Sequence, residues 1–411
     1  MSSSQVIRHL IEELQSSATQ EDDLYSDEKT RIELLGAAQG LVAALTRPDE
    51  AVASITHGAG RHMCLQVAND LGLFDLIVSK SRSAHEMASV TGANEKLIVR
   101  IMRMMVAIGF VEQSGDRVYS ATPMTRLMTL PSVKAGVEHT LEGLDILQST
   151  PEYLKKNGYH LPRTMTDTPF QFARKTELDN HKYYAEVRPE TMKTFQVFMD
   201  GLYGGPARAP WWAWYPIEEV LSVDSEVAFV DVAGGNGHQT AGLLRAFPGT
   251  KGRLIVQDLP EVIQGIKVLD PRIERMSYDF LTPQPEAVKG TTNARNGPYP
   301  QKLIQYAGAR VFFLSNILHD HPDDVCHTIL GNIRAAMTPG NSKILISDMI
   351  VPEIGPPLRQ LDSDITMFFL SGGAERSPSE WTELIKTAGL KVSKFWYPPG
   401  DQNGIIEVEI A

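Results

Sequence analysis

The sequence has very little cysteine and no long apolar run. Only Cys64 and Cys326 occur in 411 residues, which excludes a disulfide framework and does not match the ligand spacing of a zinc site; we expect both thiols in the core. No window approaches the roughly 18 consecutive apolar residues that a membrane-spanning helix requires, and the charged first residues lack the apolar centre of a signal peptide. We therefore predict a cytoplasmic protein that does not contact a membrane.

The chain also lacks an excess of basic residues. Its formal net charge is −11, with 39 Lys and Arg against 50 Asp and Glu. Because affinity for a nucleic-acid backbone comes mainly from clustered Lys and Arg, this balance argues against a nucleic-acid partner and favours a small-molecule substrate. The length exceeds the usual size of one hydrophobic core, so we expect more than one domain.

The pattern between residues 83 and 122 predicts a winged helix-turn-helix, with two helices followed by two short strands. Lys96, Arg100 and Arg103 on the second helix would suit DNA recognition, so a DNA-binding regulator is one alternative. The same helix is rich in apolar residues: Ile98, Ile101, Met102, Met104, Met105 and Val106. We expect this apolar surface to meet a second subunit, which favours a homodimer.

The C-terminal half has a different pattern. After Pro216, strands alternate with helices, which predicts a parallel sheet covered by helices on both faces. From Leu390 onward the chain predicts two antiparallel strands about a Gly-rich turn. The predicted fold class is α/β: a doubly wound Rossmann-like domain with a C-terminal antiparallel hairpin, preceded by an N-terminal helical winged-helix domain. We place the domains at 1–130, 131–215 and 216–411, the middle one being helical and substrate-lining.

A glycine loop follows the first strand of this half, in VDVAGGNGHQT. Gly234, Gly235 and Gly237 allow a sharp turn and a close approach of the backbone to a ligand. Asp258 closes the second strand, 21 residues after Gly237, which suits an acid that binds the two hydroxyls of a ribose. Loop and acid together predict a nucleotide-type cofactor without identifying it.

Two details narrow the choice of cofactor. Thr240 stands where a nicotinamide-binding loop would have glycine, and no lysine follows the loop to make a phosphate-binding P-loop. Asp231 precedes the glycines, and its carboxylate would repel a pyrophosphate but attract a ligand that carries an amino group and a sulfonium.

Several longer motifs follow one another along the chain. They are FVDVAGGNGHQTAGLLRAFPGTKGRLIVQDLPEVI, YDFLTPQP, FFLSNILHDHPDDVCHTILGNIRAAMTPGNSKILISDMIVPE, LDSDITMFFLSGGAERSPSEWTELIKTAGL and the terminal hairpin. Together they resemble the class I S-adenosylmethionine-dependent O-methyltransferases, in particular a fungal natural-product branch related to the caffeate-type enzymes. The resemblance covers roughly residues 50 to 411 and implies an intertwined homodimer that uses S-adenosylmethionine.

The resemblance also implies contacts for each part of the cofactor. The implied cofactor-binding residues are Asp231, Gly234, Gly235, Gly237, Asp258, Leu259, Asp279 and Phe280. The glycines would wrap the methionine part, Asp258 would hold the ribose, and Asp279 with Phe280 would hold the adenine. Without the resemblance, Asp279 is typical of a turn and Phe280 of a core.

The stretch ILHDHPDD follows an apolar strand and carries the residues expected to react. A phenol with a pKa near 10 needs a base at neutral pH, and histidine suits that task when a carboxylate fixes its tautomer. His319 stands at the carboxyl end of its strand, where open α/β sheets bind ligands. The resemblance implies that His319 is the base, that Asp348 and Glu375 frame it, and that Asp320 adjoins it.

Two neighbours of His319 have a structural alternative. Asp320 or His321 would cap the helix that begins near Pro322, a suitable first-turn proline. Capping and catalysis are compatible, because one residue caps while His319 reacts. No metal is implied, since a histidine base makes one unnecessary.

Three departures from the family pattern leave the reaction open. The family usually has tryptophan at the position of His321. It has a short connection where this chain has the polar stretch 286–308, and a polar stretch of that length is typical of a lid or of disorder. It also has a third glycine at the position of Ala233, which is a mild change. Some proteins of this fold keep the cofactor but catalyse dehydration or pericyclic ring formation, which needs polar groups around a carbonyl. The candidates for that role are His139, Arg208, His319 and Asp320.

Apolar and aromatic residues are the candidates for the substrate pocket. Met192, Phe198, Met199, Trp214, Met367 and Phe368 would suit a flat apolar acceptor, although each residue type is also common in cores. The aromatic run either stacks on a flat ligand or wedges two domains together, and it comprises Trp211, Trp212, Trp214 and Tyr215. We predict methylation of a hydroxyl of an aromatic or polyketide-like metabolite.

Overall fold

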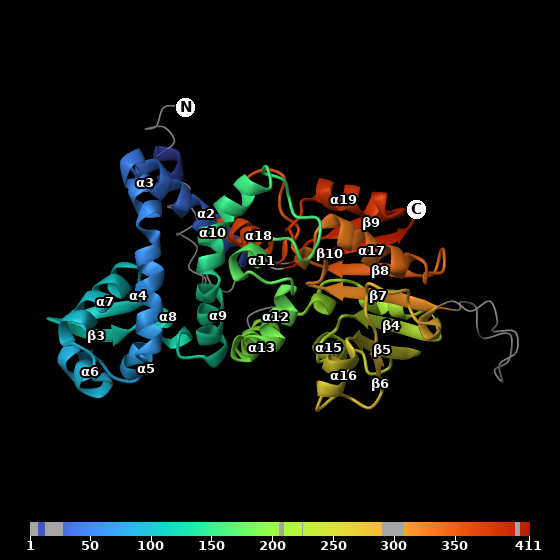
Figure 1. Ribbon diagram of the computed structural model, residues 1–411, viewed down its shortest axis with the longest axis horizontal. Helices are drawn as coiled ribbons and strands as arrows, with labels where there is room; N and C mark the ends of the chain where they lie inside the picture. Colours follow the sequence, from blue (N-terminus) through green and yellow to red (C-terminus); the bar gives the residue numbers. More distant parts are fainter. Residues whose placement is uncertain (1–6, 13–27, 205–208, 224, 290–307, 399–402) are drawn as a thin grey trace, which may run out of the picture. The chain divides into compact units, whose positions relative to one another are not determined.

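The chain folds into two compact units in the structure, a computed structural model (Figure 1). The described residues are 7–12, 28–204, 209–223, 225–289, 308–398 and 403–411. One unit comprises Met1–Leu144 and Tyr184–Gly205, and the other comprises Asp145–Tyr183 and Pro206–Ala411. The middle region expected at 131–215 is therefore divided between the two units, and the three-domain division stays a prediction.

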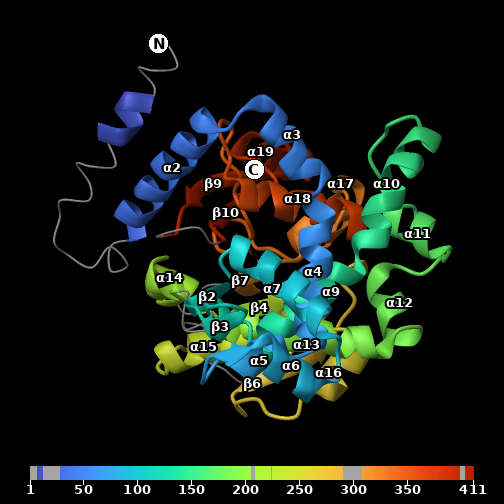
Figure 2. The same ribbon diagram turned by 90° about the vertical axis from the view of Figure 1, so that its left-hand side faces the viewer.

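The first unit contains a winged helix, whose elements lie together in Figures 1 and 2. The helices of this unit are α2 (Glu28–Leu45), α3 (Pro48–Thr56), α4 (Gly58–Asp70), α5 (Leu73–Ile77), α6 (Ala84–Thr91), α7 (Glu95–Ala107), α8 (Pro123–Leu127), α9 (Pro131–Glu142) and α13 (Pro189–Gly204). Its sheet has the antiparallel order β1 (Arg82–Ser83), β3 (Val118–Ala121), β2 (Val111–Gly115). Ser83 begins α6 with a reciprocal capping box to Glu86, and Asn94 caps α7.

The apolar residues of α7 face the core of this unit. Ile98, Ile101, Met102 and Met105 are at most 1% exposed. They pack with residues of α4, α6 and β3, among them Cys64 and Tyr119. The expectation that this surface meets a second subunit is therefore wrong, because its partners belong to the same chain.

The second unit is built on a seven-stranded sheet. Its strands are β4 (Val227–Val232), β5 (Arg253–Asp258), β6 (Ile273–Ser277), β7 (Ala309–Ser315), β8 (Lys343–Ser347), β9 (Leu390–Trp396) and β10 (Ile405–Ile410). The spatial order is β6-β5-β4-β7-β8-β10-β9, parallel through β8 and antiparallel in the final hairpin. This is the α/β class with the terminal hairpin that the sequence predicts.

Helices cover both faces of this sheet (Figure 1). They include α14 (Ile217–Leu221), α15 (His238–Ala246), α16 (Pro260–Gly265), α17 (Asp323–Arg334) and α19 (Pro378–Thr387). The helix α18 (Leu358–Ser371) packs beside α11 (Pro169–Arg174), which with α10 (Leu144–Lys156) and α12 (Asn180–Glu186) belongs to the connecting segment. Successive residues of β7 point to opposite faces: Phe312 packs in the cluster with α17 and α19, and Phe313 in the cluster with α15 and α16. The strands are apolar throughout because both faces are buried.

The aromatic run packs inside the second unit. Trp211 is 6% exposed and stacks on Phe313, with ring centroids 4.8 Å apart. Trp212 lies so close to Gly242 of α15 that a Cβ there would collide with its ring, and Tyr215 meets Trp396 of β9 edge-on. The run thus forms part of the core on the α15 face of the sheet, which neither of the two expected roles describes.

Both cysteines are buried, as predicted. Within the described ranges, every helix is too short or too polar to cross a bilayer.

Candidate active site

The central predicted cofactor and catalytic residues lie at the carboxyl ends of four adjacent strands. The strand order reverses between β4 and β7, because the chain proceeds from β4 outward to β6 and then returns. Ligands of open α/β sheets bind outside the carboxyl ends of the strands at such a switch point. The glycine loop follows β4, Asp258 ends β5, and His319 and Asp348 follow β7 and β8.

The three glycines of the loop serve different purposes. Gly235 has a positive φ of 55°, and a Cβ there would meet nothing within 4 Å, so its backbone is open to a ligand. Gly237 begins α15 with φ 74°, and a Cβ would lie 2.9 Å from Leu269. A Cβ at Gly234 would lie 2.6 Å from the carboxyl carbon of Asp231. Of the three, Gly235 is therefore the one placed for a close approach.

Ala233 also adopts a left-handed conformation, with φ 56°. A residue with a Cβ is strained there, whereas glycine is not. The replacement of the family's glycine by Ala233 is thus more consequential than the mild change expected from the sequence.

Asp231 lies beneath the loop and not at its surface. It is 1% exposed, and its Oδ2 accepts a hydrogen bond of 2.7 Å from the hydroxyl of Thr240. Burial raises the pKa of Asp231 to about 7, and the nearby charge of Asp258 acts in the same direction. Its contact is with the loop and with α15, so it shapes the cofactor site from below.

Asp258 is placed to accept hydrogen bonds from a diol. Its two carboxylate oxygens accept backbone N–H groups, from Gly235 at 2.8 Å and from Leu259 at 2.7 Å. Each oxygen retains a lone pair, and the residue is partly exposed. Burial raises the pKa of Asp258, while these two N–H donors oppose the shift. A carboxylate held against an open glycine loop fits the ribose of a nucleoside cofactor.

The residues expected at the adenine lie on the loop after β6. Asp279 is exposed and accepts the backbone N–H of Leu281 at 2.9 Å, which makes it a turn residue as well. Phe280 is partly buried, and Asn332 of α17 donates to its carbonyl at 2.9 Å. The Phe280 ring meets the His321 ring edge-on, with centroids 5.5 Å apart. Asp258 pairs with Ser277 in the sheet, so this loop adjoins the ribose acid.

His319 is held by a carboxylate from a distant segment. It lies in a 3₁₀ turn, Leu318–Asp320, and its Nδ1 is 2.9 Å from Oε1 of Glu375. The same Oε1 accepts a 2.8 Å hydrogen bond from the hydroxyl of Ser363 on α18. Asp364 accepts the backbone N–H of Glu375 at 2.9 Å. Two residues of α18 therefore fix the carboxylate that orients the imidazole.

Two further carboxylates surround this imidazole. Oδ1 of Asp320 lies 3.8 Å from Nε2 of His319. Asp348 is completely buried, and its oxygens have no hydrogen-bond partner among the described residues. Burial raises the pKa of Asp348 to about 7, although the positive charge of His319 opposes the shift.

The charge balance around His319 favours its protonated form. Burial by itself would lower the pKa of His319, but the surrounding carboxylates raise it to about 10, with the charge of Asp320 and the hydrogen bond that His319 donates to Glu375 contributing most. With its pKa raised, the side chain favours the imidazolium form at neutral pH. It acts as a base only after its Nε2 proton has left, and until then it is a strong hydrogen-bond donor.

The predicted cap of α17 is wrong. The N-cap is Pro322, and no side chain caps the helix, so Pro322 lies one position earlier than a first-turn proline. His321 is 5% exposed, and burial lowers its pKa to about 4, so that its ring is neutral. The carboxylate of Asp320 lies beside His319 instead.

The predicted substrate residues fall into two groups. His139 of α9 lies in an aromatic cluster of the first unit, 5.0 Å from Phe195 between ring centroids. Phe198 of α13 packs on Gly136, where a Cβ would lie 2.7 Å from its ring, and Met192 and Met199 of the same helix are partly buried. These contacts hold α9 against α13.

The other group belongs to the second unit. Met367 and Phe368 are partly buried on α18, and Met367 stands four residues after Ser363 and three after Asp364, on the helix face that holds Glu375. Trp214 is partly buried against the core of the α15 face. Because the two groups lie in different units, a common pocket stays a prediction. Arg208 and most of the stretch 286–308 lie outside the described residues.

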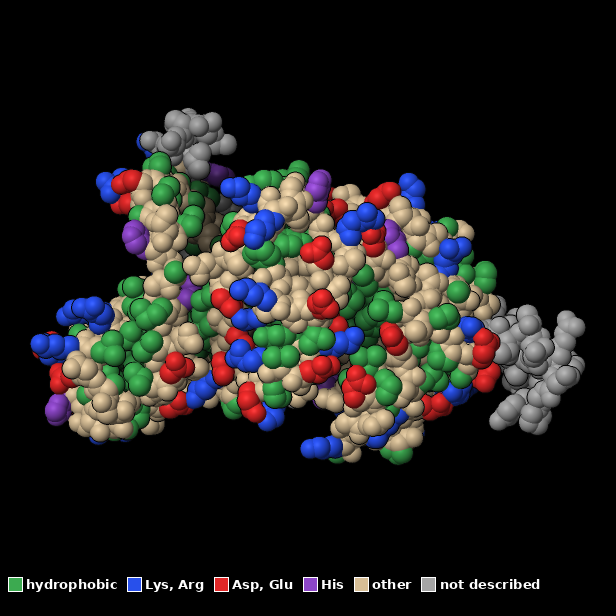
Figure 3. All heavy atoms as spheres, in the orientation of Figure 1, with side chains coloured by type: hydrophobic (Ala, Val, Ile, Leu, Met, Phe, Trp, Pro, Cys, Tyr) green, Lys and Arg blue, Asp and Glu red, His purple; other side chains and the backbone are tan. Residues whose placement is uncertain are grey.

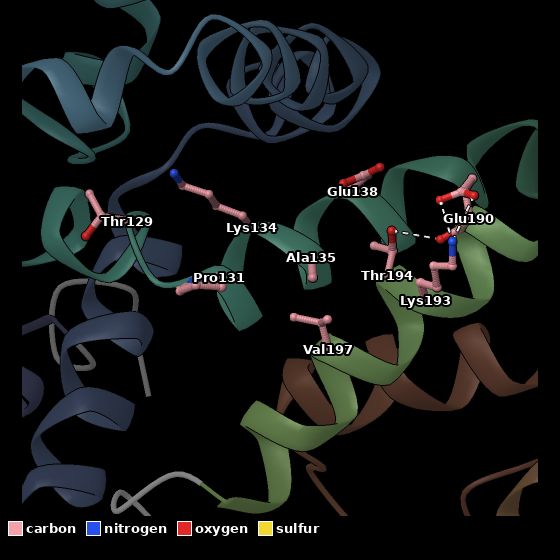
Figure 4. A pocket seen from close by; sticks show the side chains of 9 residues that line it. All are labelled: Thr129, Pro131, Lys134, Ala135, Glu138, Glu190, Lys193, Thr194 and Val197. Atoms are coloured by element: carbon pink, nitrogen blue, oxygen red, sulfur yellow. Dashed lines mark hydrogen bonds and ion pairs between the residues drawn. The ribbon is translucent and has the colours of Figure 1, made fainter. Parts of the chain in front are cut away.

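The structure also has a surface groove in the first unit, with a volume of about 420 Å³ (Figure 4). Its walls come from α13 and from α9 with the residues just before it; Glu190 and Lys193 of α13 form an ion pair of 3.1 Å at its rim. None of the predicted site residues lines this groove.

Several residues of the site have no recognisable signal in the sequence. Ser363 and Thr240 are ordinary helix residues until the fold brings them to Glu375 and Asp231. Arg376 directly follows Glu375 and is 4% exposed; its position beside an acid expected at the site was the one available hint.

The fold and site define an α/β enzyme with a nucleoside-type cofactor at the switch point and a histidine-carboxylate pair beside it. Comparison with known proteins identifies the family. A family model described as the O-methyltransferase domain matches residues 294–391, and one described as the O-methyltransferase dimerisation domain matches residues 54–130. The chain is 34% identical to O-methyltransferase penC of Penicillium thymicola, over 93% of this chain and 92% of the relative. The protein belongs to the S-adenosylmethionine-dependent O-methyltransferases, as the sequence motifs predict.

Solved structures extend the similarity to the whole chain. A structure titled "The structure of LepI complex with SAM" matches with a TM-score of 0.81 and 27% identity, covering all of both chains. One titled "A Pericyclic Reaction enzyme" matches with a TM-score of 0.80 and 28% identity over 97% of each chain. The protein is an enzyme of this family, and its cofactor is S-adenosylmethionine, as predicted.

Proposed function

We propose that the protein transfers a methyl group from S-adenosylmethionine to a hydroxyl of an aromatic or polyketide-like metabolite, with His319 as the general base. The hydrogen bond of 2.9 Å between His319 Nδ1 and Glu375 Oε1, at the carboxyl end of β7, carries this proposal. It leaves Nε2 as the atom that faces an acceptor hydroxyl. Membership of the O-methyltransferase family supports the same reaction.

The chain's own residues would orient the acceptor and move one proton. The cofactor supplies a methyl group already activated by its sulfonium. Glu375 keeps the Nδ1 proton in place and thereby fixes the tautomer in which Nε2 accepts the hydroxyl proton. Asp320 and Asp348 stabilise the imidazolium that results. A positive charge bound nearby lowers the pKa of His319, which favours the neutral base in the complex.

The cofactor contacts follow from the geometry of the loop. The open backbone of Gly235 takes the methionine part, Asp258 with the adjoining Leu259 takes the ribose hydroxyls, and the loop of Asp279 and Phe280 takes the adenine. The support is the open space at Gly235 and the free acceptor capacity of Asp258. Asp231 and the other glycines act through the shape of the loop.

The carboxylates that lie around His319 also suit a second reaction. A protonated His319 donates a hydrogen bond, as catalysis of a pericyclic or dehydration step at a carbonyl requires. The similarity to a structure titled as a pericyclic reaction enzyme points the same way. In this alternative the cofactor is bound but not consumed, and His139, Arg208 and Asp320 would help to hold the carbonyl.

The protein would work as a cytoplasmic homodimer on a small molecule. The match to a dimerisation domain supports the dimer, as do exposed apolar residues of α2 and α3: Leu35, Val42, Leu45, Val52 and Ile55. On the face shown in Figure 3, acidic and basic side chains are interspersed, which accords with a partner other than nucleic acid. The substrate-lining residues and the three-domain division remain part of this proposal.

Product masses distinguish the two reactions. The purified protein is incubated with S-adenosylmethionine and a panel of hydroxylated aromatic metabolites, together with a metabolite extract of the cells that produce it. S-adenosylhomocysteine is then quantified. Methyl transfer adds one methyl mass per S-adenosylhomocysteine released, and His319→Gln lowers the rate at least about 100-fold, while His327→Gln, at the residue of α17 bonded to Thr387, does not. A product of unchanged or dehydrated mass without S-adenosylhomocysteine would establish the alternative.

A further inference from the structure

A buried arginine lies behind the turn that carries His319. Arg376 is 4% exposed. Its Nη1 donates to the carbonyl of Leu318 at 3.0 Å, and its Nη2 donates to the carbonyl of His321 at 2.9 Å. These two carbonyls bracket the turn, one residue before His319 and two residues after it.

The charge of Arg376 is balanced within the same cluster. Asp323, the first residue of α17, accepts from Nη2 at 2.7 Å and from Nε at 3.1 Å. The guanidinium also lies over the ring of Trp381, 5.2 Å from the ring centroid. One planar group thus joins the start of α17 to both ends of the turn, a geometry that five fixed donors make possible.

The backbone around Arg376 touches the same turn directly. The N–H of Ala374 donates to the carbonyl of His319 at 2.9 Å, and a Cβ at Gly373 would collide with that carbonyl. The carbonyl of Arg376 accepts the N–H of Val351 at 3.1 Å, which ties the segment to the chain that follows β8. The backbone of residues 373–376 is therefore fixed on both sides, between the turn and the sheet.

We propose that Arg376 is a positioning residue for His319: its guanidinium holds the backbone of residues 318–321 so that the imidazole meets Glu375 and the substrate at one geometry. This inference rests on the proposed role of His319 as the reacting group. Glu375 orients the ring through its side chain, and Arg376 fixes the backbone from which the ring projects. Lysine would not replace it, because an ammonium cannot reach two carbonyls and a carboxylate in one plane.

The imidazole itself reports on this role without any turnover. In the full-length protein, the ring proton shared by His319 and Glu375 should give a downfield proton resonance that disappears in His319→Gln. We expect Arg376→Lys to shift or broaden this resonance. Arg310→Lys is the matched control, because Arg310 also donates to two backbone carbonyls, those of Val220 and Asn341, at the opposite end of β7. An unchanged resonance in folded Arg376→Lys would overturn the inference.

Kinetics provide the second test, with the acceptor that the metabolite panel identifies. Arg376→Lys should lower kcat about 100-fold, the cost of misplacing a reacting group by about 1 Å, while the KM for S-adenosylmethionine changes less than about twofold. Arg310→Lys should change neither value. Equal losses in both variants, or a loss confined to KM, would show a merely structural role and contradict the proposal.

A milder variant covers the case in which Arg376→Lys does not fold. Asp323→Asn weakens one partner of the guanidinium at a side chain that is 65% exposed, so folding should survive. We expect its kcat to fall between those of the wild type and Arg376→Lys, with a smaller shift of the ring resonance; wild-type values for both would count against Arg376. If activity survives in His319→Gln, the proposed base is wrong, and the resonance still decides whether Arg376 positions the ring.

Discussion

The two ends of the candidate site are built in different ways. At the cofactor end, the defining contact joins the backbone N–H of Gly235 to Asp258, 23 residues away. At the histidine end, the defining contact joins two side chains, His319 and Glu375, 56 residues apart. The first depends on backbone conformations that glycine permits, and the second on side chains from the turn after β7, from α18 and from the segment after α18.

This difference explains how each end responds to change. A loop whose contacts are made by the backbone should tolerate side-chain substitution at most positions and lose affinity when its acid is altered. If His319 is the base, as proposed, a cluster of side chains around it should lose rate without losing cofactor affinity when one of them is changed. Substitutions at the cofactor end should therefore change mainly the cofactor affinity, and substitutions at the histidine end should change mainly kcat.

The largest effect is expected at Glu375. Glu375→Gln removes the negative charge that holds Nδ1, so the kcat should fall about 100-fold while cofactor affinity stays. In the wild type, kcat/KM should rise with pH and level off only near pH 10, since the proposed base His319 must lose its proton and its pKa is raised to about 10. Loss of the carboxylate lowers that pKa, so the kcat/KM of the variant should level off at a lower pH.

A pH–rate profile measured by S-adenosylhomocysteine release checks this. The control is Glu383→Gln, which removes an exposed carboxylate of α19 paired with Lys386. A profile of unchanged midpoint in Glu375→Gln would mean that this carboxylate does not set the basicity of His319.

An intermediate effect is expected at Asp258. Asp258→Asn should raise the Kd for S-adenosylmethionine about 10- to 100-fold, since hydrogen bonds to a charged acceptor contribute about 1.5–3 kcal/mol, whereas the kcat at saturating cofactor should change less than about threefold. Titration calorimetry gives the Kd. Asp270→Asn, which affects a surface pair with Arg272, should leave it unchanged. A fall in kcat at saturation with the Kd preserved would remove the distinction between the two ends.

The smallest effect is expected at Ala233. Ala233→Gly relieves a φ of 56° and should raise the free energy of unfolding by roughly 0.5–1 kcal/mol. The companion change Ala241→Gly, inside α15, should lower it by about 1 kcal/mol. Denaturant titration measures both. If both variants are destabilised, the loop does not hold Ala233 in a strained conformation.

The site residues that the sequence predicts also differ in kind from those that it misses. The glycine loop and Asp258 were predictable, because their spacing follows from one strand, one turn and the next strand. The place of His319 after an apolar strand was predictable, while its role as base was implied by the resemblance and stays a proposal. The Ser363 hydroxyl and the guanidinium of Arg376 were not, because no local pattern shows which distant side chains meet in the fold.

The errors have physical causes too. The apolar face of α7 suggested a subunit interface because a helix pattern does not reveal whether its partner lies in the same chain; α4 and α6 cover it. Pro322 suggested a helix start with a side-chain cap, yet the proline itself occupies the N-cap. Arg376 already holds the carbonyl of His321 from the other side.

The two buried thiols make the chain convenient for labelling. Cys64 lies in the winged-helix core, and Cys326 donates to the carbonyl of Leu318 beneath the histidine turn. Burial raises the pKa of Cys326 to about 12, and only a thiolate reacts with maleimides. Cysteines introduced at exposed positions, one in each unit, such as Val90 and Val268, would therefore take up fluorophores selectively. Energy transfer between them would then follow the two units in solution as cofactor and substrate bind.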